Sequence, residues 1–135
     1  ALVAKKKRTT RMKADERVVP RVTFLSTEVA SVGMTQNEAQ KSFGKVLVGR
    51  YSFSALGRTA TEHGPDGLVK IIAHPKTRKV IGGHIIGERA GEVIHEIALA
   101  IYLNATIDKL ASMIHAFPSY SESVTAAASS AKLES

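Results

Sequence analysis

Apolar residues recur at spacings of three and four between residues 90 and 104, and this periodicity predicts a helix. The residues that set the period are Ile94, Ile97, Ala98, Ile101 and Ala105. Further apolar residues, Val93, Ala100 and Leu103, extend the apolar surface almost all round. A helix that is apolar on more than one face needs more than one neighbour, so we expect it to cover a core and also to face a partner.

Shorter apolar runs elsewhere are typical of strands, because they are rich in β-branched residues and bounded by turn residues. The predicted strands are a short one at Val22 to Phe24, an extended piece at 29–33, and runs at 45–52, 68–73 and 79–86. The last two runs, joined by residues 75–78, predict a hairpin with a longer loop. Residues 53–57 fit either a loop or a helical turn, and residues 63–67 carry turn chemistry.

Three further helices follow from capping signals. Thr35 with Glu38 forms a capping-box pattern that predicts a helix to about Ser42, ended by Gly44. Thr106 is expected to cap a helix that runs to about His115 before Pro118 breaks it. Ser119 with Glu122 forms a second capping-box pattern, which predicts a helix to about Lys132.

The order of these elements predicts an α+β fold. Strands come first, a hairpin lies in the middle and helices come last, which favours a mainly antiparallel sheet with helices packed on one face. The 135 residues, of which 44% are hydrophobic, suffice for one core. We expect one domain over residues 21–135, preceded by a basic linker or disordered entry at residues 1–20.

Charge and composition narrow the function classes. Residues 1–21 hold eight Lys and Arg against two acidic residues, so most of the net charge of +7 lies in the expected linker. No aromatic residue is interleaved there to stack on a base, so nucleic acid is not the expected partner. The chain has no cysteine, and its five histidines lack metal-ligand spacing, so no metal site is expected. No apolar run approaches the roughly 20 residues that span a bilayer, and we expect a cytoplasmic protein without membrane contact.

Four stretches fall in the order of one known domain. They are VPRVTFLSTEVASVGMTQNEA at 19–39, GLVKIIAHPKTRKVIGGHIIGERAGEVIHEIALAI at 67–101, NATIDKLASMIHAFP at 104–118 and SYSES at 119–123. The second stretch is the most specific, through its hairpin, its glycines and its long helix. The chain thus resembles the C-terminal dimerisation, or interface, domain of the pyridine nucleotide-disulfide oxidoreductases, the family of dihydrolipoamide dehydrogenase, glutathione reductase and mercuric reductase.

The resemblance implies an intact enzyme that uses FAD and NAD(P)H, held by upstream domains of the same polypeptide. The sequence in hand has no Gly-x-Gly-x-x-Gly after a strand; its glycine cluster at Gly82, Gly83 and Gly87 has the wrong spacing. We therefore expect this chain alone to bind neither cofactor and to catalyse nothing.

One position departs from the pattern of the thiol-handling members that the chain resembles. In those proteins a histidine stands directly before the proline of the motif, and a glutamate stands four positions after the proline. The two residues act together as general acid and base in the active site of the partner subunit. Here Phe117 precedes Pro118, and Glu122 occupies the glutamate position. A phenyl ring transfers no proton, so the resemblance implies an acceptor that needs no histidine-assisted thiol protonation, such as a quinone, a metal ion or another oxidant. For Glu122, capping and catalysis both stay open.

Two residues near Phe117, His115 and Tyr120, are candidates for the role of the missing histidine. His115 lies two residues before it, and in a helix that spacing points the ring away from Phe117. Phe-Pro is similar to mercuric reductases, which carry a tyrosine directly after the proline. Here Ser119 fills that place and Tyr120 follows, so we expect Tyr120 to pack on the core at the start of a helix.

The resemblance also implies a two-fold homodimer with an isologous interface, in which both subunits use the same surface. The expected interface residues are Ile94, Ile97, Ile101, Ile114 and Tyr120. Phe117 and Pro118 are expected to face the flavin of the partner subunit. Two alternatives stay open: a stand-alone interaction module that keeps the fold without redox chemistry, and a nucleic-acid binder that uses the basic tail.

Overall fold

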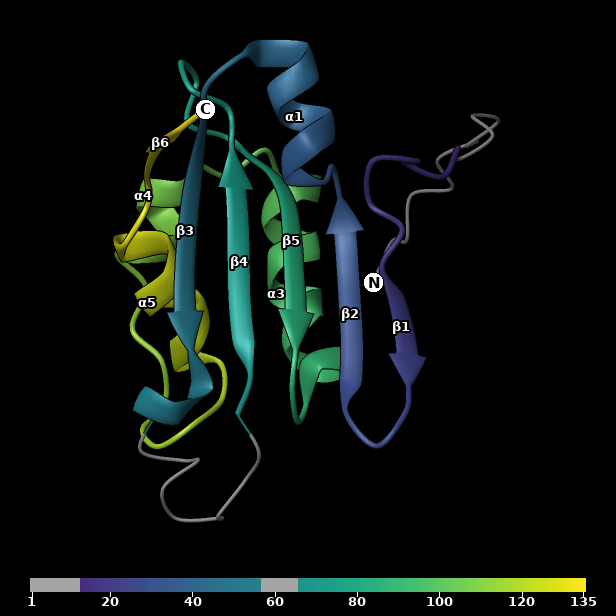
Figure 1. Cartoon of the computed structure of the whole chain (residues 1–135), viewed down its shortest axis with the longest axis vertical. Coiled ribbons are helices and arrows are strands. Elements are labelled where there is room, and N and C mark those ends of the chain that lie inside the picture. The colour runs from purple at the N-terminus through teal and green to yellow at the C-terminus, as the bar shows by residue number, and fades with distance from the viewer. Residues whose placement is uncertain (1–12, 57–65) are drawn as a thin grey trace, which may run out of the picture.

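The sheet is the frame of the molecule (Figure 1). The computed structural model describes residues 13–56 and 66–135, which form a six-stranded antiparallel sheet in the order β1-β2-β5-β4-β3-β6. The strands are β1 (Arg21–Phe24), β2 (Glu28–Gly33), β3 (Val46–Ser52), β4 (Leu68–Ala73), β5 (Val80–Ile86) and β6 (Lys132–Glu134). The expected α+β class, the antiparallel sheet and the β4–β5 hairpin are confirmed.

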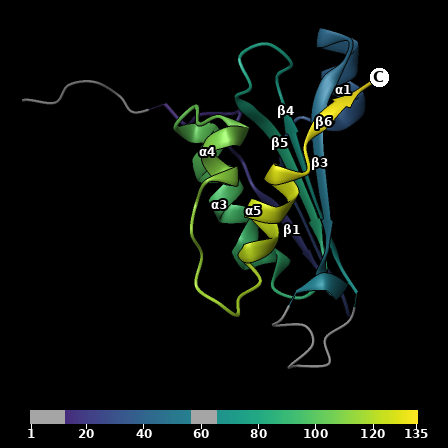
Figure 2. The ribbon, with the colours of Figure 1, turned by 90° about the vertical axis from the view of Figure 1, so that its left-hand side faces the viewer.

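Helices cover the sheet unequally. In the described residues they are α1 (Gln36–Phe43), the 3-10 turn η1 (Phe53–Ala55), α3 (Ala90–Tyr102), α4 (Ile107–Ala111) and α5 (Glu122–Ser129). Figure 2 shows α3, α4 and α5 together on one side of the sheet and α1 on the other. None of the helices in these residues is long and apolar enough to cross a membrane.

The core follows the alternation of side chains along the strands. Leu47 and Ile71 point into the main core under α3 and α5, whereas Val46, Val48 and Ile72 form a second small cluster with Ala39 of α1. Successive residues of a strand face opposite sides, so these central strands are apolar on both. The expectation of helices on a single face therefore holds for α3, α4 and α5, while α1 covers one end of the opposite face.

Local capping signals place two helix starts correctly. The Thr35 hydroxyl accepts a hydrogen bond from the Glu38 amide at 3.2 Å, and the Glu38 carboxylate accepts one from the Thr35 amide at 2.9 Å. The chain leaves α1 at Gly44, whose φ is 76°. The Thr106 hydroxyl caps α4 by accepting from the Lys109 amide at 3.3 Å. Both of these predictions are confirmed.

Two helix ends are predicted too late. The helix after Thr106 was expected to reach His115 but ends at Ala111, and the helix after Glu122 was expected to reach Lys132 but ends at Ser129. Residues Lys132–Glu134 instead pair with β3 as the edge strand β6. The cause is long-range: the Ser130 hydroxyl accepts from the Arg50 amide at 3.0 Å and donates to the Arg50 carbonyl at 2.8 Å, which ties the chain to β3.

The described structure begins before the expected domain boundary. Val18 packs against the main core, and the Arg17 guanidinium donates to the Asn104 side chain at 2.9 Å. The packed part of the chain thus includes residues assigned to the linker at 1–20. Residues 1–12 of that linker, and 63–65 of the turn expected at 63–67, lie outside the described residues.

Close approach of helix and sheet depends on two glycines. A Cβ at Gly83 of β5 would overlap the Ile97 side chain of α3, and a Cβ at Gly49 of β3 would overlap the Ala127 carbonyl of α5. A backbone carbonyl cannot move aside as a side-chain tip can. Gly49 therefore fixes the distance between α5 and the sheet.

We predict that Gly49→Ala lowers the free energy of unfolding by about 3 kcal/mol, because the new methyl group forces α5 away from β3. Chemical denaturation monitored by circular dichroism measures the change. Thr23→Ala, at an exposed site on β1, serves as the control and should change the value by less than about 0.5 kcal/mol. Equal effects of the two substitutions would contradict this account of Gly49.

An ion pair fastens β6 to β3. The Arg50 guanidinium donates to both carboxylate oxygens of Glu134, in one case at 2.9 Å, and the Gln36 amide of α1 donates to the same carboxylate at 3.1 Å. The pKa of Glu134 lies below its ordinary value, mainly because its carboxylate accepts the hydrogen bond from Arg50. Desolvation raises the pKa of Glu134, but by less.

Because the folded-state pKa of Glu134 is lowered, the pair stabilises the fold above the ordinary glutamate pKa, and this contribution is lost as pH falls through the lowered value. We predict that Glu134→Gln costs less than about 1 kcal/mol at pH 7, since the pair is partly exposed. Denaturation curves of both proteins from pH 7 to pH 3 should show the difference shrinking towards zero. Glu16→Gln, in the N-terminal segment, is the control, and a difference that grows towards acid pH would contradict the assignment.

Candidate functional site

Phe117 and Pro118 lie in the segment 112–121, which joins α4 to α5. Figure 2 shows this segment running along the outer side of the helical layer, away from the sheet. The Phe117 side chain is 78% exposed, and its peptide bond to Pro118 is cis. The residue that takes the place of the family's histidine is thus on the surface, where a second molecule can reach it.

A hollow of about 360 Å³ opens beside Phe117. Its lining includes Glu122 and Thr125 of α5, Tyr51 of β3 and His115. The structure therefore brings Phe117 and Glu122 to the lining of one hollow. It also brings His115 there, which the sequence did not predict.

Glu122 performs half of the expected capping box. Its carboxylate accepts a hydrogen bond from the Ser119 amide at 2.8 Å. The Ser119 hydroxyl is buried and has no hydrogen-bond partner among the described residues, and the residue before α5 is Ser121, which makes no side-chain cap. The reciprocal bond from Ser119 is thus absent, and the prediction of a complete box is wrong, because the helix begins later than the pattern indicated.

Tyr120 belongs to the core. It is 7% exposed, its ring lies 5.4 Å from that of Phe53 between centroids, and its hydroxyl donates to the Glu88 carboxylate at 3.2 Å. Its expected packing at the start of a helix is confirmed. Its assignment to a subunit interface is wrong, because its side chain is enclosed by its own chain.

The interface residues expected on the long helix are also corrected. Ile94, Ile97 and Ile101 are buried in the main core, because α3 turns them towards Gly83 and the sheet. The exposed apolar residues of the helix and its end are Leu99, Tyr102 and Leu103. Their spacing of three and four was a usable signal, since such residues share one side of a helix.

The Phe117 segment carries further exposed apolar residues and is tied to the same helix. Glu96 precedes Leu99 by three residues on α3, and its carboxylate lies 2.7 Å from the His115 ring. This contact brings Ile114, which is 96% exposed, beside the same side of α3. We call this surface the apolar face; it consists of Leu99, Tyr102, Leu103, Met113, Ile114 and Phe117.

His115 does not point away from Phe117, as a helical geometry predicted. The helix ends at Ala111, so the helical angle between the two residues does not apply. The His115 side chain is 9% exposed; its Nε2 lies 2.7 Å from Glu96 and its Nδ1 lies 2.8 Å from the Thr125 hydroxyl. Both ring nitrogens are therefore engaged within the chain.

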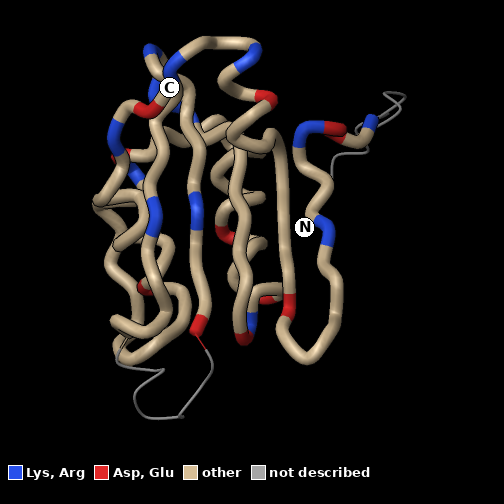
Figure 3. The backbone as a smooth tube through the Cα atoms, viewed as in Figure 1, with Lys and Arg blue, Asp and Glu red and all other residues tan. Residues whose placement is uncertain are grey.

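Basic side chains lie on the opposite side of the sheet. Arg50 and Lys70 are cross-strand neighbours on β3 and β4, and Figure 3 shows basic residues at mid-height on these two strands. Gln36 of α1 accepts hydrogen bonds from both. Gln36 therefore holds these two basic side chains side by side on this face.

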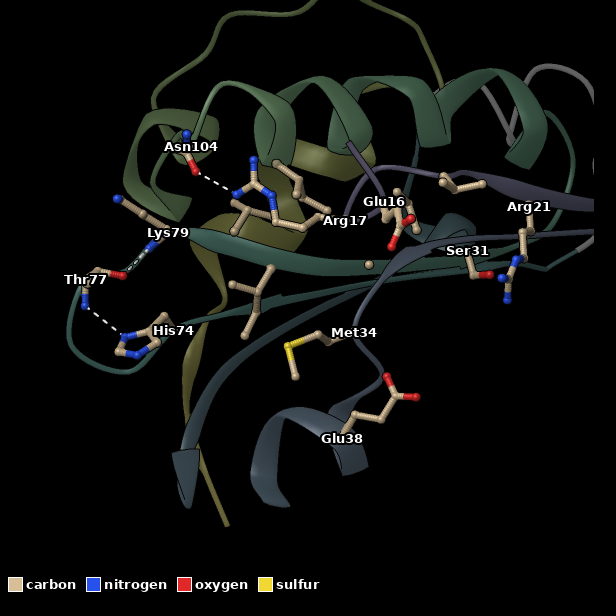
Figure 4. A pocket seen from close by; sticks show the side chains of 16 residues that line it. Glu16, Arg17, Arg21, Ser31, Met34, Glu38, His74, Thr77, Lys79 and Asn104 are labelled. Atoms are coloured by element: carbon tan, nitrogen blue, oxygen red, sulfur yellow. Dashed lines mark hydrogen bonds between the residues drawn. The ribbon is translucent and has the colours of Figure 1, made fainter. Parts of the chain in front are cut away.

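A larger hollow, of about 680 Å³, lies away from Phe117 (Figure 4). The N-terminal segment, the end of β2 and the β4–β5 hairpin line it with both acidic and basic residues. Two of its polar side chains already have hydrogen-bond partners within the chain. Arg17 donates to Asn104, and the His74 ring accepts from the Thr77 amide at 3.1 Å. Among residues 13–56 and 66–135, no group of three potential ligand side chains is placed to hold a metal ion.

The described helix N-termini do not fit a dinucleotide. A pyrophosphate is commonly bound by free amides at a helix N-terminus that follows a glycine-rich turn. At α3 the Gly91 amide donates to the Glu28 carboxylate of β2 at 2.8 Å, and α1 and α4 are capped by their own threonines. At each of these three helix starts, an amide that could face a pyrophosphate is thus bonded within the chain.

The comparisons with known proteins agree with this geometry. Residues 19–128 match the model of the pyridine nucleotide-disulphide oxidoreductase dimerisation domain. The dihydrolipoyl dehydrogenase of Haloferax volcanii is 38% identical over 117 residues, which are 87% of this chain and 25% of that protein. The mitochondrial dihydrolipoyl dehydrogenase of Pisum sativum is 40% identical over 110 residues, which are 82% of this chain and 22% of that protein.

Solved structures share the fold. LpdA of Mycobacterium tuberculosis superposes with a TM-score of 0.75 at 29% identity, over 87% of this chain and 26% of that one. The HOCl-induced flavoprotein disulfide reductase RclA of Escherichia coli gives 0.77 at 25% identity, over 84% and 26%. The chain spans about a quarter of the length of these relatives. It belongs to the dimerisation-domain family of the pyridine nucleotide-disulfide oxidoreductases.

Proposed function

We propose that this domain joins two copies of its polypeptide into a two-fold homodimer through the apolar face. In an isologous contact the same residues serve both subunits, so one self-complementary apolar surface suffices. The family to which the domain belongs supports self-association as its task.

The observation that carries this proposal is the exposure of the apolar face. Ile114 is 96% exposed and Leu103 is 64% exposed, although the chain buries many of its other large apolar residues in two clusters. Contiguous exposed apolar surface on a folded protein marks an interaction site, because leaving it in water is unfavourable. The open face of the sheet also exposes Val29, Ile86 and Leu68, but to a smaller extent, between 38% and 46%.

In the intact protein, we propose that electrons pass from NAD(P)H through FAD to an acceptor, since the family is named for pyridine nucleotides and the structural relative RclA is a flavoprotein. The cofactors would be held by domains outside this chain, since α1 and α4 are capped by their own threonines and the Gly91 amide of α3 is bonded to Glu28. The contribution of this domain would be to hold two subunits in register and to place Phe117 and Pro118 against the flavin region of the partner.

Phe117 limits the chemistry that this domain can supply. The ring has no titratable group, and His115, which shares its hollow, has both nitrogens bonded to Glu96 and Thr125. We propose that the acceptor is one that needs no proton from this segment. Glu122 keeps its bond to the Ser119 amide and acts there as a capping group.

We predict that Leu103→Glu weakens self-association of the chain at least about tenfold, because it places a charge in the apolar face. Sedimentation velocity across micromolar to millimolar concentration measures the dimer dissociation constant. Leu25→Glu, an exposed leucine at the β1–β2 turn, is the matched control and should leave the constant unchanged. A wild-type chain that stays folded at its monomer mass of 14.5 kDa throughout would contradict the proposal.

In the polypeptide that carries the flavin and nicotinamide domains, we predict slow turnover of lipoamide or glutathione disulfide but normal flavin reduction by NAD(P)H. Proton transfer by a positioned side chain contributes about 10²- to 10⁴-fold to rate, and Phe117 cannot supply it. Phe117→His should recover part of this loss in steady-state disulfide reduction.

The double variant with Phe117→His and Glu122→Gln is the control for that measurement. It should lose the gain if the new imidazole depends on the Glu122 carboxylate in the shared hollow. Fast disulfide turnover by the wild-type protein would show that another group delivers the proton.

A further inference from the structure

We propose that His115 is a positioning residue: its two ring hydrogen bonds clamp the segment 113–117 onto α3 and α5 and so build the apolar face. The inference rests on the proposed function, because it explains how the surface used for dimerisation is held in shape. It assigns His115 a role other than proton transfer to a substrate.

The segment has few other attachments. Within residues 13–56 and 66–135, the Met113 amide donates to the Leu110 carbonyl at 3.3 Å, and the amides of Ile114, Ala116 and Phe117 donate no hydrogen bond. Ile114 and Phe117 project into solvent, so their side chains do not anchor the backbone either. His115, with a side chain that is 9% exposed, is the inward-pointing residue between them.

The clamp joins two helices through one ring. On one side Nε2 meets the Glu96 carboxylate of α3 at 2.7 Å, and on the other Nδ1 meets the Thr125 hydroxyl of α5 at 2.8 Å. The Thr125 hydroxyl also lies 3.2 Å from the Leu110 carbonyl at the end of α4. The same hydroxyl lies 3.4 Å from the Met113 carbonyl; having one proton, it donates at any time to only one of its neighbours, while the His115 ring joins α3 to α5.

The hydrogen-bonding capacity of imidazole suits this position in either charge state. A neutral ring donates from Nε2 to Glu96 and accepts from the Thr125 hydroxyl at Nδ1. A protonated ring donates at both nitrogens, and the Thr125 hydroxyl then donates to the Leu110 carbonyl. Glu122 and Tyr51 are the other ionisable residues that line the same hollow. Each state leaves both nitrogens bonded, so the ring can hold the segment to α3 and α5 in either state.

The clamp determines where the exposed apolar residues lie. With His115 fixed to Glu96, Ile114 lies beside the side of α3 that carries Leu99 and Leu103. If the clamp is released, the segment samples other conformations and must be ordered again whenever two copies associate. Ordering a segment on binding weakens association, so the loss of the clamp should raise the dissociation constant.

The experiment compares His115→Leu, Thr125→Val and Thr125→Ser with the wild-type chain by sedimentation velocity and by hydrogen exchange with mass spectrometry. We expect His115→Leu and Thr125→Val to weaken association on the order of tenfold and to speed amide exchange in 113–117. Thr125→Ser keeps the hydroxyl and should restore both values to near wild type, which a purely space-filling role of Thr125 would not explain.

His84→Leu is the matched control. His84 is also partly buried and its ring bonds to the Met34 carbonyl at 3.0 Å, but it lies on the opposite face of the sheet. It should leave exchange in 113–117 and association unchanged. If His115→Leu fails to fold, Thr125→Val tests the clamp instead, because it keeps the volume of the side chain and removes the hydroxyl.

Two outcomes separate this inference from the proposed function. If exchange in 113–117 and association are both unchanged in His115→Leu and Thr125→Val, the clamp is overturned while dimerisation stands. If the wild-type chain is a monomer at every concentration but exchange in the segment speeds up in both variants, the clamp stands and dimerisation through the apolar face is overturned.

Discussion

The approach of the helical layer to the sheet is the constraint on which the rest of the structure depends. Gly83 admits the Ile97 side chain of α3, and Gly49 admits the backbone of α5. With these helices seated, the rotation of α3 is decided: Ile97 and its neighbours one turn away are buried, and Leu99 and Leu103 face solvent. The apolar face is therefore a consequence of how closely α3 packs, because burial of one side of an all-round apolar helix leaves the other side exposed.

Long-range polar contacts then hold the ends of the helices and strands in place. Glu28 of β2 caps the start of α3 through the Gly91 amide, although the two residues are far apart in sequence. Arg50 of β3 holds Glu134 of β6, and His115 holds the segment before α5 against Glu96. Each contact joins the end of one element to the side of another. Such contacts satisfy groups that the termini of helices and strands leave free.

The candidate site combines an exposed Phe117 with a buried His115 two residues before it. This alternation gives the segment one side that is available to a partner and one side that is fixed to its own chain. A residue able to transfer protons is thus present near Pro118, but it is committed to structure. Phe117 therefore stands where the resemblance implies a proton-transferring histidine. This difference concerns the electron acceptor that we propose, and it leaves the fold unchanged.

By itself, the sequence determined the elements whose signals are local. Period-two and period-3.6 patterns located β2 to β5 and α3, and Thr35, Glu38 and Thr106 located helix starts, because these signals act within a few residues. Only the tertiary structure decided where α4 and α5 end, that residues 132–134 form a strand, and that Ile94 is core while Leu99 and Leu103 are surface. The physical reason is that these outcomes depend on partners distant in the chain: Arg50 for Ser130, Glu96 and Thr125 for His115, and Gly83 for the side of α3 that is buried.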